Sequence, residues 1–307
     1  MKLVFFGTPQ FAADIMTGLQ KKGVEIAAVV TAPDAKVGRK QILTPSPVKQ
    51  LALDQGIPSF TPERVKDPEF IQELQQITAD AWLVVAYGKI LPQSFLDLMR
   101  EKVINIHPSR LPQYRGPAPM QAALRNGDSS TATTLMVMDR KMDHGPIIAQ
   151  REVLLDLDET YPELADRMVG ECVELVSDHL PKYLAGDIQA REQDHDQATY
   201  VSLLTKQDGL IDWNTPAHDL YNQYRAYTPW PGTYSHINRK KINLEFQGLS
   251  DTELTPGSWQ FDQELIVGTE SGSVKVSRIK PEGKSWQTPQ QFIQSYGPTG
   301  SFTKTQS

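Results

Sequence analysis

An asparagine and a histidine, Asn105 and His107, stand two residues apart at the end of the short apolar segment 102–107. Residues two apart on a β-strand point to the same side, so the two side chains are predicted to share one face. An amide can donate to a developing oxyanion, and an imidazole can donate or move a proton. The pair therefore suits a reaction centred on a carbonyl group. The alternative is that both side chains satisfy backbone groups of the following loop.

The loop after this segment is stiff, because prolines at positions 108, 112, 117 and 119 and a glycine at 116 restrict its backbone. A second polar turn, Met-Asp-Arg-Lys-Met-Asp-His-Gly-Pro, occupies residues 138–146. Its Asp143 could hydrogen-bond His107, set the tautomer of the ring and stabilise its charged form. The stiff loop and the acidic turn favour catalysis, and we expect the two pieces to form one active site.

The segments around these residues predict an α/β fold. Residues 2–6 and 24–30 are apolar strands that flank a helix, an arrangement typical of a parallel sheet. The turn after residue 7 is not Gly-x-Gly-x-x-Gly, so a dinucleotide site is poorly supported. We expect a Rossmann-like, mostly parallel sheet with helices on both faces, and further strands at 57–60, 81–86, 102–107, 132–138 and 147–155.

The second half of the chain has a different pattern. A long helix is expected over 161–184, kinked or shortened by Pro181 and carrying a buried Cys172. The polar tail after Tyr296 is expected to fray. Short alternating segments predict a small, OB-like β-barrel, with strands at 233–237, 241–247, 264–268 and 273–279. The predicted domains are a catalytic domain at 1–188, a linker at 189–205 and the β-barrel at 206–307.

Composition bounds the class of protein. The 307 residues are 39% hydrophobic and 22% charged, with a net charge of −6, which fits a two-domain globular protein without an overall basic character. A single cysteine allows no internal disulfide, and no apolar run approaches the ~20 residues of a membrane-spanning helix. We therefore expect a cytoplasmic protein. The remaining histidines lack metal-ligand spacing, and His144 is expected to be a solvent-exposed loop residue.

Basic residues gather in the long segment 31–47, where Lys36, Arg39 and Lys40 stand close together. Such a cluster can contact phosphates, and the alternative is an ordinary solvated surface. Long loops in compact domains are often functional, so the segment is a candidate binding element.

The motif N-I-H-P-S-x-L-P-x-x-R-G-x-x-P at 105–119, followed by the acidic turn, resembles the 10-formyltetrahydrofolate-dependent formyltransferases. Two further segments, D-A-K-V-G-R-K-Q-I-L-T-P-S-P-V-K at 34–49 and D-W-N…Y-R-A-Y-T-P-W-P-G at 212–232, resemble the branch of that family that formylates methionyl-tRNA. The resemblance spans nearly the whole chain.

The resemblance implies roles for particular residues. Asn105, His107 and Asp143 match the family's catalytic trio, and Leu111–Pro112 is expected to be a cis bond. One departure is Arg110, where the family often has Leu. The implied folate-binding residues are Ser109, Arg110, Leu111, Pro112, Tyr87, Gly88, Ile90, Leu91 and Asp139, and the implied tRNA-binding residues are Lys36, Arg39 and Lys40.

The implied reaction is direct transfer from 10-formyltetrahydrofolate, as co-substrate, to the amino group of initiator methionyl-tRNA, without a metal. Asn105 and protonated His107 would stabilise the oxyanion of the tetrahedral intermediate, and the proton would pass through His107 or a water held by Asp143. Folate and the tRNA are the implied partners, and a monomer without membrane or protein partners is expected.

Two alternatives remain open. The first is a formyltransferase whose acceptor is an amino-sugar nucleotide or glycinamide ribonucleotide, in which most of the core would be unchanged. The second is a non-catalytic tRNA-binding protein. A formyl-folate hydrolase or dehydrogenase would be expected to carry an active-site cysteine, whereas Cys172 lies far along the chain.

Overall fold

The computed structural model describes residues 1–38 and 40–303, and the predicted role of Arg39 lies outside the described residues. The chain forms two compact units. The first unit consists of Met1–Pro119, Ser130–Leu154 and Ala165–Val201, and the second consists of Met120–Ser129, Leu155–Leu164 and the chain from Ser202 onward.

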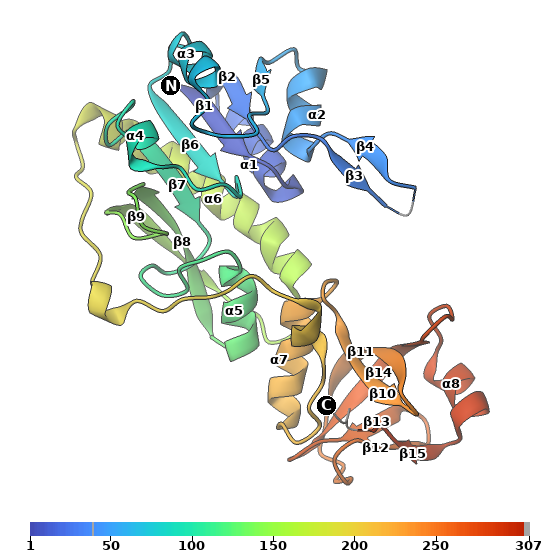
Figure 1. The fold of residues 1–307 in the computed structure, drawn as a ribbon. Coiled ribbons are helices and arrows are strands. Elements are labelled where there is room, and N and C mark those ends of the chain that lie inside the picture. Colours follow the sequence, from blue (N-terminus) through green and yellow to red (C-terminus); the bar gives the residue numbers. More distant parts are fainter. Residues whose placement is uncertain (39, 304–307) are drawn as a thin grey trace. The chain divides into compact units, whose positions relative to one another are not determined.

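The first unit is built on a sheet that, in the described part of the chain, has the strand order β5-β2-β1-β6-β7-β8-β9 (Figure 1). Neighbouring strands pair in parallel from β5 through β2, β1 and β6 to β7. Strand β8 is antiparallel to both of its neighbours, β7 and β9. The predicted mostly parallel sheet is confirmed. The strands are β1 (Lys2–Gly7), β2 (Glu25–Val30), β5 (Ser59–Phe60), β6 (Ala81–Val85), β7 (Val103–His107), β8 (Ser130–Val137) and β9 (Ile147–Leu154).

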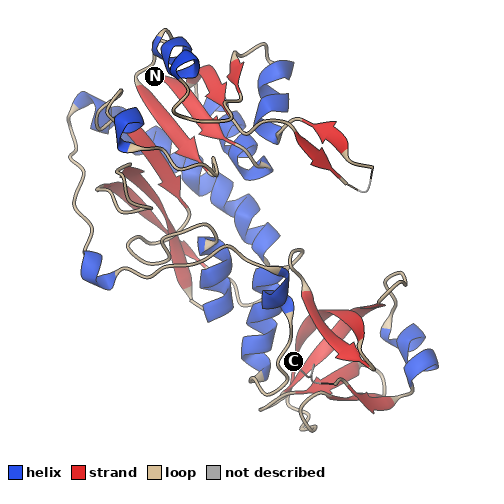
Figure 2. Ribbon diagram, viewed as in Figure 1, coloured by secondary structure: helices blue, strands red, loops and turns tan. Residues whose placement is uncertain are grey.

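Helices cover both faces of this sheet (Figure 2). One apolar cluster joins the sheet to α1, α2 and α6, and another joins the opposite face to α3 and α4, because successive strand residues point to opposite sides. The helices of the first half of the chain are α1 (Gln10–Lys21), α2 (Pro47–Asp54), α3 (Pro68–Gln75), α4 (Gln93–Leu96), α5 (Pro119–Asn126) and α6 (Tyr161–Ala185).

Three local predictions can be compared with these elements. Pro181 does not shorten the long helix, because α6 continues through it to Ala185, and the alternative of a kink stays a prediction. Cys172 is fully buried in α6, as predicted. The segment expected to be a long loop contains a small hairpin, made of β3 (Ala35–Val37) and β4 (Ile42–Thr44).

The second unit carries a curled antiparallel sheet of strand order β10-β11-β14-β13-β12-β15. A bridge between His236 and Thr303 connects its first strand to the residues that follow its last strand, in agreement with the predicted small barrel. Its strands are β10 (Thr233–Ile237), β11 (Lys240–Ser250), β12 (Ser258–Phe261), β13 (Leu265–Gly268), β14 (Ser273–Pro281) and β15 (Thr299–Ser301). The remaining helical elements are α7 (Ala217–Tyr227), α8 (Pro289–Tyr296), η1 (His195–Gln197) and η2 (Lys206–Gly209).

The prediction of a frayed tail after Tyr296 is wrong as far as the described residues extend. Residues 299–301 pair with β12, and Phe302 is buried. Phe302 stacks on Trp213 at 5.2 Å between ring centroids and tilts against Trp259 at 5.0 Å, so an aromatic anchor holds the tail.

None of the helices in the described part of the chain combines the length and the apolarity needed to cross a membrane.

Candidate active site

Strand β7 presents Asn105 and His107 on one face of the sheet. Ile104 and Ile106 pack into the cluster with α1 and α6, whereas Val103 packs into the cluster on the opposite face. By alternation, Asn105 and His107 share the side of Val103. Both are buried, at 8% and 5% exposure, next to the carboxyl end of a parallel strand, where open α/β sheets place their ligands.

The acidic turn reaches this pair from a distant part of the chain. Asp143 Oδ1 lies 3.6 Å from His107 Nδ1, with both side chains mostly buried. The other carboxylate oxygen, Oδ2, accepts the backbone N–H of Gly116 at 2.7 Å. The distance to His107 exceeds that of a hydrogen bond, so the contact is an electrostatic approach. The two pieces singled out in the sequence therefore meet in the fold.

The partners of the His107 ring define which nitrogen carries a proton. Nε2 lies 3.0 Å from the carbonyl oxygen of Tyr114, and a carbonyl can only accept, so Nε2–H is the donor. Nδ1 then faces the carboxylate of Asp143. A doubly protonated ring would face an acceptor on each side, and among the described residues Nδ1 has no hydrogen-bond partner.

The Asn105 amide has no hydrogen bond to any other residue that the structure describes, although its backbone lies between Val84 and Met136 in the sheet. Polar side chains this little exposed usually have a hydrogen-bond partner in the protein. Asn105 is therefore free to donate to a bound molecule.

The stiff loop after β7 is held by β8 and β9. The Leu111–Pro112 peptide bond is cis, as expected. Thr134 Oγ1 donates to the Ser109 carbonyl at 2.6 Å, and Gln150 Nε2 donates to the Leu111 carbonyl at 2.8 Å. Arg110 points to the surface instead, where it pairs with Glu152 and thereby lowers the pKa of that carboxyl.

The second group of predicted folate residues lies at the switch in strand order between β1 and β6. Thr8 Oγ1 donates to the Tyr87 carbonyl at 3.0 Å across this switch. Tyr87 and Leu91 are buried in the core, whereas Gly88 and Ile90 are exposed. Burial raises the pKa of Tyr87 to about 12, and its hydroxyl has no hydrogen-bond partner among the described residues.

Asp139 uses its carboxylate within the acidic turn. Oδ1 accepts the backbone N–H of Lys141 at 2.8 Å, and Oδ2 lies 2.6 Å from His144 Nδ1. The prediction that His144 is a solvent-exposed loop histidine is wrong. Its ring is mostly buried and stacks on His195 at 3.8 Å between centroids, a contact that the spacing of the two residues does not indicate.

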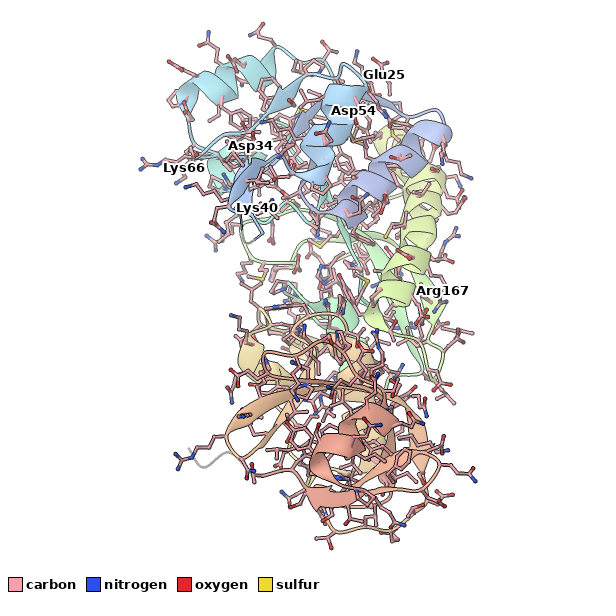
Figure 3. The ribbon with its side chains drawn as sticks, turned by 90° about the vertical axis from the view of Figure 1, so that its right-hand side faces the viewer. Glu25, Asp34, Lys40, Asp54, Lys66 and Arg167 are labelled. Carbon is pink, nitrogen blue, oxygen red and sulfur yellow. The ribbon has the colours of Figure 1, made fainter. Side chains whose placement is uncertain are left out.

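Two of the basic residues, Lys36 and Lys40, belong to the exposed β3–β4 hairpin. Lys36 lies on β3 and Lys40 in the turn, both exposed, and Figure 3 labels Lys40. The apolar side chains of Val37, Ile42 and Leu43 are exposed on the same hairpin. Lys49, beyond the hairpin, is instead paired with Asp34 at 2.6 Å.

The sequence predicted no role for one buried residue of the stiff loop, Arg115. Arg115 is only 1% exposed, and its backbone pairs with residues 199–201, which lie within the predicted linker. A charged residue beside a glycine in a rigid loop is a weak signal, and its partners lie about eighty positions away.

Comparison with known families identifies a transferase of one-carbon groups. Residues 1–180 match the family described as Formyl transferase, and residues 203–297 match the Formyl transferase C-terminal domain. The chain belongs to the formyl transferase family.

Relatives that match over nearly the whole chain carry a narrower name. The chain is 37% identical to "Methionyl-tRNA formyltransferase" of Geobacter sulfurreducens, over 96% of this chain and 94% of the relative. It is 39% identical to the protein of the same name from Thermotoga neapolitana, over 92% of each chain.

Solved structures share the fold at lower identity. A sugar 3N-formyl transferase, WlaRD, crystallised with dTDP and 5-N-formyl-THF, has a TM-score of 0.67 at 18% identity, over 93% of this chain and 99% of that chain. An N-formyltransferase from Helicobacter canadensis, in complex with folinic acid and dTDP-3-aminofucose, has a TM-score of 0.66 at 19% identity, over 90% and 98% respectively. At these identities the likeness concerns the fold.

Proposed function

We propose that this chain transfers the formyl group of 10-formyltetrahydrofolate to the free amino group of methionyl-tRNA, with initiator tRNA as acceptor. The observation that carries the proposal is that Asp143 lies beside His107. His107 is on β7, the strand that also carries Asn105. The names of the full-length relatives support this donor and acceptor.

The reaction is a direct acyl transfer. The amine nitrogen of the methionyl group attacks the formyl carbon, which forms a C–N bond and a tetrahedral intermediate with a negative oxygen. The bond from that carbon to the folate nitrogen then breaks, and the proton lost by the amine goes to the folate nitrogen. Atoms and electrons balance without an oxidant, a reductant or a covalent enzyme intermediate.

Each member of the trio has a distinct task. The Asn105 amide donates to the oxyanion, because none of the described residues hydrogen-bonds it. Nδ1 of His107 serves the reacting groups, since Nε2 is bonded to the Tyr114 carbonyl. Asp143 stabilises the charged ring and holds the water that relays the proton. Removal of one oxyanion donor typically costs about 10²–10³-fold in kcat.

Folate binds along the loop formed by Ser109, Arg110, Leu111 and Pro112. Gly88 and Ile90 contact it from the neighbouring switch in strand order, where α/β sheets bind ligands, and the buried Tyr87 and Leu91 hold that segment in place. Asp139 belongs to the same site and keeps the acidic turn in shape through Lys141 and His144.

The acceptor tRNA is bound by basic residues and by a separate domain. Lys36, Arg39 and Lys40 contact its phosphates, and the domain at 206–307 provides a second binding surface, after a catalytic domain at 1–188 and a linker at 189–205. Support for this division comes from the matches at 1–180 and 203–297. Phosphate contacts of this kind weaken as salt rises.

The first experiment identifies the acceptor. The enzyme is offered 10-formyltetrahydrofolate with charged initiator tRNA, charged elongator tRNA, an amino-sugar nucleotide or glycinamide ribonucleotide, and formylated product is quantified. Formyl-methionyl-tRNA is the expected product. Product from a nucleotide acceptor alone would overturn the acceptor, and product from none would favour a non-catalytic tRNA-binding protein.

The second experiment tests the trio. Asp143→Asn and His107→Ala are expected to lose turnover by at least about 10²-fold while remaining folded, as judged by circular dichroism. His179→Ala is the matched control, because among the described residues the His179 ring hydrogen-bonds only the Leu175 carbonyl, within α6. Near-normal turnover in either variant would contradict the catalytic role proposed for that residue.

A further inference from the structure

Arg115 is a buried cation whose partners are neutral. Its Nη2 donates to Gln193 Oε1 at 2.7 Å and lies 2.9 Å from His195 Nδ1. Its Nε donates to Gln193 Oε1 at 3.2 Å, and Nη1 donates to the Tyr200 hydroxyl at 3.1 Å. A buried guanidinium is stable only when its donors are used, so these contacts tie Arg115 firmly to residues 193–200.

Gln193 passes this constraint to the acidic turn. Its Oε1 accepts two donors of Arg115, so its amide nitrogen must face the other way. There Nε2 donates to the backbone carbonyls of Asp143 at 3.0 Å and Gly145 at 2.8 Å. Gln193 is 6% exposed, and the orientation of its amide is fixed by the guanidinium.

The contacts close into a ring around the reacting pair. Gly116, which follows Arg115, donates its N–H to Asp143 Oδ2, and Tyr114, which precedes Arg115, offers its carbonyl to His107 Nε2. Arg115 therefore sits between the two backbone groups that hold His107 and Asp143. The Arg115 side chain also bonds Gln193, which in turn donates to the Asp143 carbonyl, so the main chain and the carboxylate of Asp143 are both held.

Asp143 needs such a constraint, because its own backbone opposes the position it takes. Its φ angle is +49°, in the left-handed region, which is unfavourable for residues with a Cβ although aspartate adopts it more readily than most. The next residue, His144, is held by Asp139 and by the ring of His195. Strained conformations persist only where the surroundings over-determine them.

We propose that Gln193, oriented by Arg115, is a positioning residue that fixes Asp143 opposite His107 for formyl transfer. The inference rests on the proposed catalytic role of Asp143. Gln193 acts through the main chain of the acidic turn, and residues 193–200 thereby become part of the catalytic unit.

The test uses Gln193→Glu in the full-length enzyme. Glutamate keeps an acceptor for Arg115, and a buried ion pair with it supports folding. The variant loses the donors to the two carbonyls, so the acidic turn moves. We expect kcat to fall by about 10–10²-fold, because small misplacements of catalytic groups have effects of this size. The KM for 10-formyltetrahydrofolate is expected to stay near the wild-type value.

Gln223→Glu is the matched control. Gln223 is also 6% exposed and donates to two backbone carbonyls, those of Asp208 at 2.8 Å and Leu210 at 3.2 Å. Its substitution perturbs the fold in a similar way, but the kcat of the folded enzyme and its pH profile are expected to match the wild type. If Gln193→Glu does not fold, Gln193→Met removes the same donors without a charge and should give the same loss of kcat.

A double-mutant cycle separates positioning from a general structural effect. If Gln193 acts through Asp143, Gln193→Glu causes no further loss of kcat in an Asp143→Asn background, and both single variants change the pH profile in the same way. Additive losses, or wild-type kcat in Gln193→Glu while Asp143→Asn is inactive, would overturn this proposal alone. Near-normal turnover in Asp143→Asn would overturn the proposed function instead.

Discussion

Gly116 is the position where the stiff loop is most sensitive to a single methyl group. A Cβ at residue 116 would lie 2.2 Å from the carbonyl oxygen of Val201, and the φ angle there is +118°. The N–H of the same residue holds Asp143 Oδ2. Gly116→Ala therefore tests whether residues 199–201 press on the loop and whether that contact matters for the reaction.

The expected destabilisation has two parts. An unfavourable positive φ costs an alanine about 1–2 kcal/mol, and an overpacked contact adds about 1–3 kcal/mol. Gly186→Ala is the matched control, because Gly186 has a φ of +84° but nothing within 4 Å of a Cβ placed there. The control should carry a positive-φ cost alone, and the φ of Gly116 lies further from the left-handed region than that of Gly186, so Gly116→Ala is expected to be less stable by at least the second.

Thermal unfolding followed by circular dichroism checks this prediction. A difference of 1 kcal/mol corresponds to about 2–4 °C in Tm for domains of this size, so Gly116→Ala should melt several degrees below Gly186→Ala. Its kcat should also fall, whereas Gly186→Ala keeps wild-type turnover. Equal midpoints for the two variants would refute the close packing of Val201 on Gly116.

Two further predictions concern buried aromatic residues elsewhere in the chain. Phe302→Ala removes the ring that packs on Trp213 and Trp259, and urea unfolding followed by tryptophan fluorescence should show a loss of about 3–5 kcal/mol. The pKa of Tyr87 in the folded state, about 12, lies above its ordinary value of 10.0. The stabilisation that Tyr87 contributes through this shift is complete at a pH below its ordinary pKa and is lost as the pH rises through its folded-state pKa. Between these two pKa values, the urea midpoint of Tyr87→Phe should therefore fall less than that of the wild type.

The sequence was sufficient for the elements that bury an apolar face. The alternation in β7 placed Asn105 and His107 on one side, and the continuous apolar strands indicated a parallel sheet with helices on both faces. Short strands without strong periodicity, such as β12 and β15, were missed. They are defined by partners far along the chain, and Phe302 alone gives little indication of the pocket that it fills.

The polar part of the site was only partly predictable. Local composition singled out the motif residues, but the contacts of Arg115 with Gln193 and His195 join segments 78 and 80 positions apart. Hydrogen bonds between such residues leave no periodic pattern in either segment. The polar composition of residues 189–205 is typical of a linker, and it carries no indication that Gln193 is buried against the acidic turn.

The contacts around Asp143 keep its carboxylate at a set distance from the His107 ring, and this distance matters for the proposed reaction. An unrestrained carboxylate 3.6 Å from an imidazole would close to a hydrogen bond and occupy Nδ1. Gly116 holds one carboxylate oxygen and Gln193 holds the main chain, so Oδ1 remains near Nδ1 without engaging it. In the proposed reaction, that gap leaves the nitrogen open to substrate while the negative charge still stabilises the protonated ring. Because the anchors fix a distance within the site, their loss should reduce turnover more than binding of the formyl donor.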